Sequence, residues 1–169
     1  MRKHCDAIDP AIAATGVPCL PLDGDTLTER NIMIRRTSPQ VENFITPDVF
    51  KGFGFNQIVS AGDTVHLAGV VANVGGLDDL RIVHPEDTAG QLDFILRVIE
   101  DLLRTEGLDR TNLVSLTIYA SDLPALAEAI PRVYVPWVGD HAPNMSIVKV
   151  AGFLLPGQVL EIPAIAYRG

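Results

Sequence analysis

The sequence contains few of the residues that build disulfide scaffolds or metal centres. Its only cysteines, Cys5 and Cys19, lie close to the N-terminal end, and no CxxC or HxxxH spacing occurs. Two cysteines do not frame a compact disulfide fold, and paired ligands at such spacings are the usual mark of a metal site. We therefore expect no metal. Two reduced thiols fit better than a Cys5–Cys19 bridge, although the two could pair.

Basic charge and long apolar runs are also scarce. The net charge is −8 at pH 7, and adjacent basic residues occur at only two places. Nucleic-acid binding depends on lysine and arginine that neutralise phosphates. No stretch approaches the roughly 18 apolar residues that span a bilayer, and Asp6 and Asp9 interrupt any apolar run after the basic start. We expect no nucleic-acid partner, no membrane partner and a cytoplasmic location.

The chain has 169 residues, of which 47% are hydrophobic and 20% charged. This length and composition suit one folded domain with a good core. Residues 1–30 contain scattered prolines, glycines and acids without a helical or strand period. This pattern predicts a flexible N-terminal extension. The folded domain is expected over residues 31–169.

One helix has a clear signature between Asp87 or Thr88, either of which can cap its start, and Gly107, which can end it. Apolar residues recur there at steps of three and four, which predicts a buried stripe. They are Leu92, Ile95, Leu96, Ile99, Leu102 and Leu103.

A second helix is expected after Ser121 or Asp122. An interior proline costs ~3 kcal/mol, so we expect a break near Pro131 and a short helical piece that reaches Trp137. Pro163 lies in the last expected strand and predicts a sheet edge or a bulge there.

Strands are expected at residues 32–36, 55–60, 64–71, 113–120, 145–151 and 158–167, and residues 37–54 are expected to form a loop. The order β-β-β-α-β-α-β-β does not alternate strictly. It predicts an α+β fold, in which a mixed β-sheet carries two helices on one face. A partner subunit is expected to cover the other face.

Several blocks resemble the RidA/YjgF reactive-intermediate deaminases. They are residues 55–59, residues 61–69, the helix that ends at Gly107 and residues 155–166, and the resemblance spans about residues 31–168. It implies a chorismate-mutase-like fold and a homotrimer with pockets between its subunits. It also implies cofactor-free hydrolysis of enamines and imines derived from amino acids.

The sequence departs from this family at its polar anchors. Met145 stands where the family has an arginine that binds the substrate carboxylate, and a thioether cannot form that two-pronged contact. Phe55 replaces a tyrosine, and Pro131 replaces an asparagine. Glu161 aligns with the carboxylate that orients or activates water, and Gly69 with a glycine that lines the pocket. The resemblance thus implies Glu161 as the catalytic residue. The implied substrate-binding residues are Phe55, Gly69, Pro131, Asn144, Met145, Ser146 and Ile147.

These residues predict a pocket with apolar walls and few polar groups, which suits a small ligand that lacks the usual carboxylate. One hypothesis is a diverged enzyme that acts on an enamine, imine or enol-type metabolite. The alternative is a non-catalytic binding or regulatory trimer. Ribonuclease activity, which is sometimes assigned to the family, is disfavoured by the acidic composition. His66 fits a core or subunit-interface position and His141 a surface loop, and a pocket role is left open for both.

Overall fold

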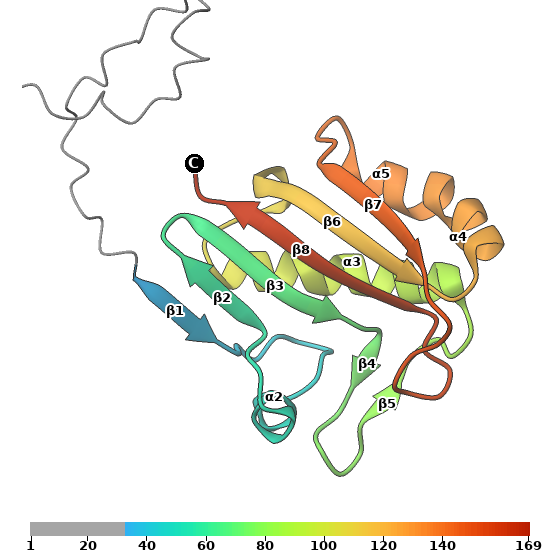
Figure 1. Cartoon of the computed structure of the whole chain (residues 1–169), viewed down its shortest axis with the longest axis horizontal. Helices are drawn as coiled ribbons and strands as arrows, with labels where there is room; N and C mark the ends of the chain where they lie inside the picture. Colours follow the sequence, from blue (N-terminus) through green and yellow to red (C-terminus); the bar gives the residue numbers. More distant parts are fainter. Residues whose placement is uncertain (1–32) are drawn as a thin grey trace, which may run out of the picture. The chain divides into compact units, whose positions relative to one another are not determined.

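Six strands form the main sheet of the computed structural model, which describes residues 33–169. Their order is β1-β2-β3-β8-β6-β7 (Figure 1). The sheet is mixed, because β6 and β7 run parallel while the other neighbours are antiparallel. The strands are β1 (Ile34–Thr37), β2 (Ile58–Ala61), β3 (Thr64–Val70), β6 (Leu113–Ala120), β7 (Asn144–Lys149) and β8 (Leu160–Tyr167). The predicted extension over residues 1–30 lies outside the described residues.

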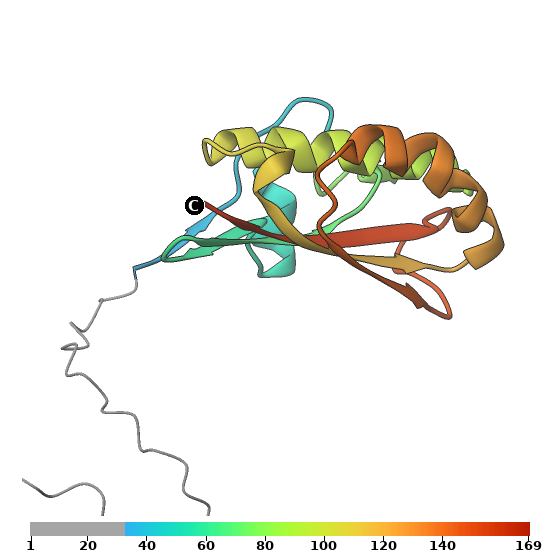
Figure 2. The same cartoon turned by 90° about the horizontal axis from the view of Figure 1, so that it is seen from above.

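The helices lie on one face of this sheet, as predicted. The long α3 (Thr88–Thr105) packs beside a second helical stretch made of α4 (Leu123–Ala129), a π-helical turn (Ile130–Tyr134) and α5 (Val135–Val138). Figure 2 shows α3, α4 and α5 on the same side of the sheet, and none of them covers the opposite face. Among residues 33–169, no helix is long and apolar enough to cross a membrane.

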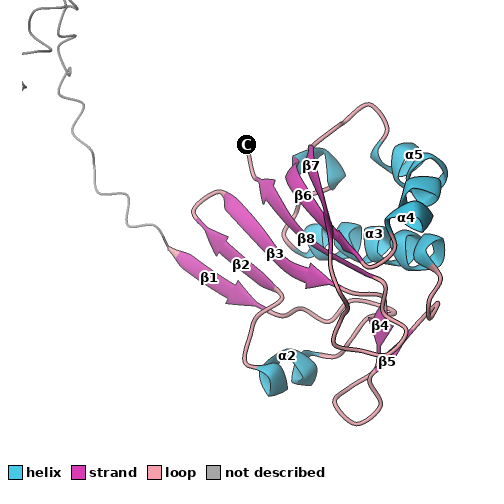
Figure 3. Ribbon diagram, turned by 45° about the vertical axis from the view of Figure 1, so that its right-hand side comes forward, coloured by secondary structure: helices cyan, strands magenta, loops and turns pink. Residues whose placement is uncertain are grey.

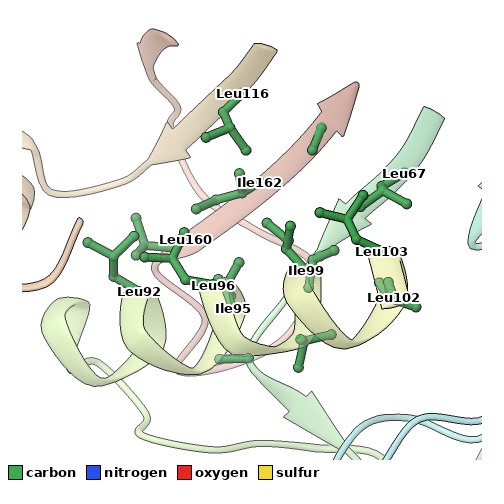
Figure 4. Packing of buried hydrophobic residues seen from close by; sticks show 14 of the residues in the cluster. Leu67, Leu92, Ile95, Leu96, Ile99, Leu102, Leu103, Leu116, Leu160 and Ile162 are labelled. Carbon is green, nitrogen blue, oxygen red and sulfur yellow. The ribbon is translucent and has the colours of Figure 1, made fainter. Parts of the chain in front are cut away.

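The core lies between α3 and the sheet. Leu92, Leu96 and Ile99 point from the helix toward the side chains of β8, β6 and β3 (Figure 4), and all three are essentially inaccessible to solvent. Burial of each such side chain contributes about 1.5–3 kcal/mol. The expected ends are also present, because the Asp87 carboxylate accepts the backbone N–H of Gly90 at 3.0 Å and Gly107 has a φ of 71°. The spacing of apolar residues therefore predicted this helix correctly.

The prediction of a loop over residues 37–54 is wrong in part, because it contains the short helix α2 (Pro47–Phe53). Proline at the first position suits a helix, since its missing N–H has no partner there and its φ is already helical. Gly54 ends the helix with a φ of 75°. Pro47 and Gly54, which lie at the two ends of α2, thus start and stop a helix inside the predicted loop. A further pair of short strands, β4 (Asn73–Val74) and β5 (Arg81–Ile82), was not predicted.

Pro131 and Pro163 are accommodated in different ways. The chain stays helical through Pro131 by widening to a π-turn, in which the N–H of Val135 donates to the carbonyl of Ile130. The predicted break is therefore wrong. Pro163 lies in β8, a central strand, so the edge position is excluded. The register of β3 shifts between Leu67 and Val70, opposite Pro163, which is the predicted bulge.

Candidate functional site

A cavity of about 150 Å³ lies beyond the ends of β3 and β8. It is bounded by α2, by the β4–β5 hairpin and by the loop 154–158. Figure 3 shows α2, β4 and β5 at the same end of the sheet. One water needs roughly 10–15 Å³, so the cavity has room for a small organic group. Its lining residues are Phe44, Ile45, Val49, Phe50, Phe53, Phe55, Gln57, Gly69, Val71, Asn73, Leu80, Leu154, Leu155, Gln158 and Glu161.

Four phenylalanines form one wall of this cavity. Phe44 and Phe50 are buried, with 5% and 1% of their surface exposed, and they pack with ring centroids 6.2 Å apart. Phe55 meets Phe50 edge to face at 5.4 Å, an arrangement that aromatic rings favour. Phe53 and Phe55 are 53% and 41% exposed, so they form an apolar rim at the entrance.

The polar side chains of the cavity are three amides and one carboxylate, from Gln57, Asn73, Gln158 and Glu161. No lysine, arginine or histidine of the described chain lines it. Asn73 is 6% exposed, and its Oδ1 has no hydrogen-bond partner among residues 33–169. Leaving a buried acceptor unpaired costs about 1–3 kcal/mol, so this atom needs a donor from elsewhere.

Glu161 projects from β8 on the face away from α3, because its neighbours Leu160 and Ile162 are buried toward the helix. Its side chain lies directly over Gly69 of β3. A Cβ built on Gly69 would overlap Oε1 of Glu161 and would lie 2.7 Å from Cδ. Only glycine leaves this space, so Gly69 sets the position of the carboxylate in the cavity.

Gln91 of α3 holds the loop 154–158 in place. Its side chain is fully buried, and its Nε2 donates to the carbonyls of His84 and Gly157 at 3.0 and 2.7 Å. Its Oε1 accepts the backbone N–H groups of Val159 and Leu160. One amide thus satisfies four backbone groups next to the residues that enter the cavity.

Asp48 joins α2 to the β4–β5 hairpin on the outer side of the cavity. Its carboxylate accepts hydrogen bonds from the Thr46 hydroxyl and, at 3.0 Å, from the backbone N–H of Leu77. These bonds, the Thr46 hydroxyl first, lower the pKa of Asp48 below its usual value. The carboxylate therefore stays ionised and keeps both contacts at neutral pH.

Three of the predicted site residues, Phe55, Gly69 and Glu161, meet in the cavity. The other five do not line it within this chain. Pro131 is exposed on the π-turn, and residues 144–147 lie on β7, an edge strand that pairs only with β6 among the described strands. Met145 is partly buried against the core, while Asn144, Ser146 and Ile147 are exposed.

The two histidines left open by the sequence lie outside the cavity. His66 is exposed on β3 and borders a second hollow of about 210 Å³ on the uncovered sheet face, with Ser115, Thr117 and Ile165. His141 is half-buried, and its Nε2 lies 2.8 Å from the carbonyl of Leu113, which can only accept. His141 therefore fastens the loop before β7 to the start of β6.

Sequence reasoning missed most of the aromatic wall and Asn73. A signal for the wall was present, because four of the six phenylalanines fall between residues 44 and 55. Phe55 was predicted as a site residue, but Phe44, Phe50 and Phe53 were set aside with the expected loop. Within residues 33–169, no group of three histidine, cysteine, aspartate or glutamate side chains could hold a metal ion. Cys5 and Cys19 lie outside the described residues.

Comparison with known proteins identifies the family. The family model described as Endoribonuclease L-PSP matches residues 51–168. A YjgF/YER057c/UK114 family member from Mycobacterium tuberculosis is 25% identical, with a TM-score of 0.63 over 80% of this chain and 99% of that one. A putative endoribonuclease from Thermotoga maritima is 20% identical, with a TM-score of 0.65 over 80% and 98% of the two chains.

A third solved structure, RidA from an Antarctic Psychrobacter, is 22% identical, with a TM-score of 0.63 over 78% of this chain and 99% of that one. No curated protein matches the chain significantly. The family match covers well over half of the chain, and the TM-scores show that the solved structures share its fold. The chain therefore belongs to the L-PSP family, which includes the YjgF and RidA proteins.

Proposed function

We propose that this protein is a cofactor-free hydrolase of small enamines, imines or enol-type metabolites that carry no carboxylate. The observation that supports this most is the Glu161 carboxylate, held over Gly69 in a cavity whose other walls are apolar or amide. A carboxylate in such a setting can orient a water molecule and accept its proton. The family arginine that would bind a substrate carboxylate is replaced by Met145.

The reaction needs only water and proton transfers. Water, held by Glu161, adds to the carbon of the protonated C=N bond while its proton passes to the carboxylate. The carbinolamine then takes that proton on nitrogen, and the C–N bond breaks as its hydroxyl gives a proton back to the carboxylate, so that ammonia leaves with a ketone or aldehyde as the second product. An enamine first takes a proton on carbon, which converts it to the same iminium. No electron acceptor or metal is required for this sequence.

We also propose that the active form is a homotrimer, in which β7 of one copy borders the cavity of the next. This arrangement is supported by the place of residues 144–147 on an exposed edge strand, away from the cavity of their own chain. In such an assembly, Met145 presents a thioether where relatives of the family present a guanidinium. The substrate then meets an apolar group at the position of the usual anchor.

The test is a comparison of imines with and without a carboxylate. Iminopropionate and the uncharged imine of phenylacetaldehyde are generated in situ, and ammonia release is followed with and without the protein. We expect acceleration for the uncharged imine and little for iminopropionate. Glu161→Gln should lower the acceleration by about 10²–10⁴-fold, the usual contribution of general acid–base catalysis. Glu128→Gln, on the exposed face of α4, is the matched control.

The second candidate is a binding or regulatory trimer without chemistry. It is favoured by the replacement of the family's tyrosine by Phe55 and of its arginine by Met145, because these changes remove two polar groups that the family uses. If the protein binds ligands but Glu161→Gln changes neither binding nor turnover, the enzymatic proposal is wrong. Cleavage of RNA is not proposed, because the net charge is −8 and no basic side chain of the described chain lines the cavity.

A further inference from the structure

The cavity contains more hydrogen-bond acceptors and negative charge than it can satisfy alone. Within one copy of the chain its one charged side chain is Glu161, and no lysine, arginine or histidine among residues 33–169 of that copy lines it. A ligand that carries a carboxylate would place two negative charges together in a confined apolar space. Such a pairing is unfavourable, since two like charges at short range repel each other.

Asn73 indicates independently that the missing group is a donor. Asn73 is 6% exposed, and its Oδ1 meets no donor among the described residues. The backbone N–H of Asn73 is already used by the carbonyl of Val71 at 2.8 Å. The residue lines the cavity, but the oxygen itself is shielded from solvent. A ligand N–H would therefore pair this oxygen only when the Asn73 amide turns toward the cavity.

The aromatic wall suits a positive charge with an apolar body. Phe44, Phe50 and Phe55 stand in contact with one another on one side of the cavity, and Phe53 extends the wall to the entrance. Aromatic faces attract cations, by about 0.5–1 kcal/mol when exposed and about 2 kcal/mol when desolvated. Leu154, which is 77% exposed at the rim, lengthens the apolar surface beyond the cavity.

We propose that the cavity binds an organic cation, a protonated amine or iminium on an aromatic or branched apolar body, with no carboxylate. Glu161 binds the charge, the Asn73 amide turns to accept a second N–H, and the phenylalanines enclose the apolar part. This inference rests on the proposed function in one respect: the cation and the imine that is hydrolysed are placed in the same cavity. It adds the substrate class, because the iminium of the hydrolysis is itself such a cation.

Three probes of the same shape test the proposal by titration calorimetry on the full chain. Phenethylamine is cationic, 2-phenylethanol is neutral and phenylacetate is anionic, and none has a C=N bond that could turn over. We expect phenethylamine to bind about ten- to hundredfold more tightly than the alcohol, the usual effect of a hydrogen bond to a charged group. Phenylacetate should bind most weakly.

Two variants separate recognition from folding. Glu161→Gln should reduce the affinity for phenethylamine to that for 2-phenylethanol and leave the alcohol unchanged. Asn73→Leu should weaken amine binding without lowering the melting temperature, because Oδ1 gives up no hydrogen bond. A structural role for Asn73 would instead lower the melting temperature and affect all three probes.

The outcomes distinguish this inference from the proposed function. Tight amine binding without imine turnover supports the cation site and overturns the hydrolase. Turnover of uncharged imines, together with equal binding of amine and alcohol, supports the hydrolase and overturns the cation site. Tightest binding of phenylacetate, or no binding of any probe, also overturns the cation site.

Discussion

At the scale of single residues, the site depends on Gly69 and Glu161, which lie against each other on neighbouring strands. Gly69 has no Cβ, and the space this leaves is filled by the carboxylate of Glu161 from the neighbouring strand. The φ of Gly69 is not in the left-handed region, since the positive-φ glycines of the described chain lie elsewhere. The requirement for glycine is therefore steric, and it concerns the position of Glu161 rather than the backbone.

Gly69→Ala should therefore move Glu161 without unfolding the sheet. The atoms in conflict with the new Cβ belong to a flexible side chain, so we expect a small change in melting temperature and a loss of turnover comparable to that of Glu161→Gln. The double variant should lose no more than either single variant, because both remove the same group. Kinetics and thermal melts of the three variants measure this.

Gly152→Ala is the control, since a Cβ at Gly152 would meet no atom within 4 Å. Additive losses in the double variant would show that Gly69 acts independently of Glu161.

At the scale of elements, one buried amide couples α3 to the loop that closes the cavity. Gln91 joins the loop 154–158, the start of β8 and the segment before α3 through four backbone groups. Gly157 fits closely there, with a φ of 79° and a Cβ position 2.8 Å from Cβ of Pro85. The loop thus keeps its shape through tertiary contacts and not through a repeating local pattern.

Gln91→Leu should destabilise the protein by about 2–4 kcal/mol, since it removes several hydrogen bonds and leaves buried backbone groups unpaired. Urea denaturation measures the loss. Gln40→Leu, at an exposed position, is the control and should change stability by less than about 0.5 kcal/mol. Equal stabilities of the two variants would mean that the loop is held by other contacts.

At the scale of the whole molecule, the sheet face opposite α3 has the composition of a surface that a partner can cover. It presents Thr117 and Ile165 beside a hollow, whereas the other face is filled by the core. The exposed edge strand β7 carries Ile147 and Val148, which are 43% and 41% exposed. Apolar residues on an open face and an unpaired edge favour association.

The proposed homotrimer predicts a solution mass of three chains of 18.2 kDa each. Ile165→Arg should dissociate the assembly, because it places a charge on the face that would be buried. Val135→Arg, on the exposed side of α5, should leave the mass unchanged. Light scattering coupled to size exclusion measures the masses. A monomeric wild-type chain would contradict the trimer and, with it, the placement of β7 at a neighbouring cavity.

Much of the fold was predictable because its elements carry local periods. The three- and four-residue spacing of α3 and the alternation of β6 and β8 reflect contacts made by neighbouring turns and residues. The prediction errors concern proline, which can start a helix as well as interrupt one. Pro47 starts a helix inside the predicted loop, and Pro131, where a break was predicted, sits inside a helix that widens to a π-turn.

The sequence by itself determined the composition of the site: a glutamate at residue 161, a glycine at residue 69 and no arginine at residue 145. Tertiary structure decided which of these groups meet. The cavity joins residues from position 44 to position 161, and its unpaired Asn73 oxygen is defined by the absence of a neighbour in space. Local patterns record local contacts, whereas the pairing of distant side chains exists only once the sheet has brought their strands together.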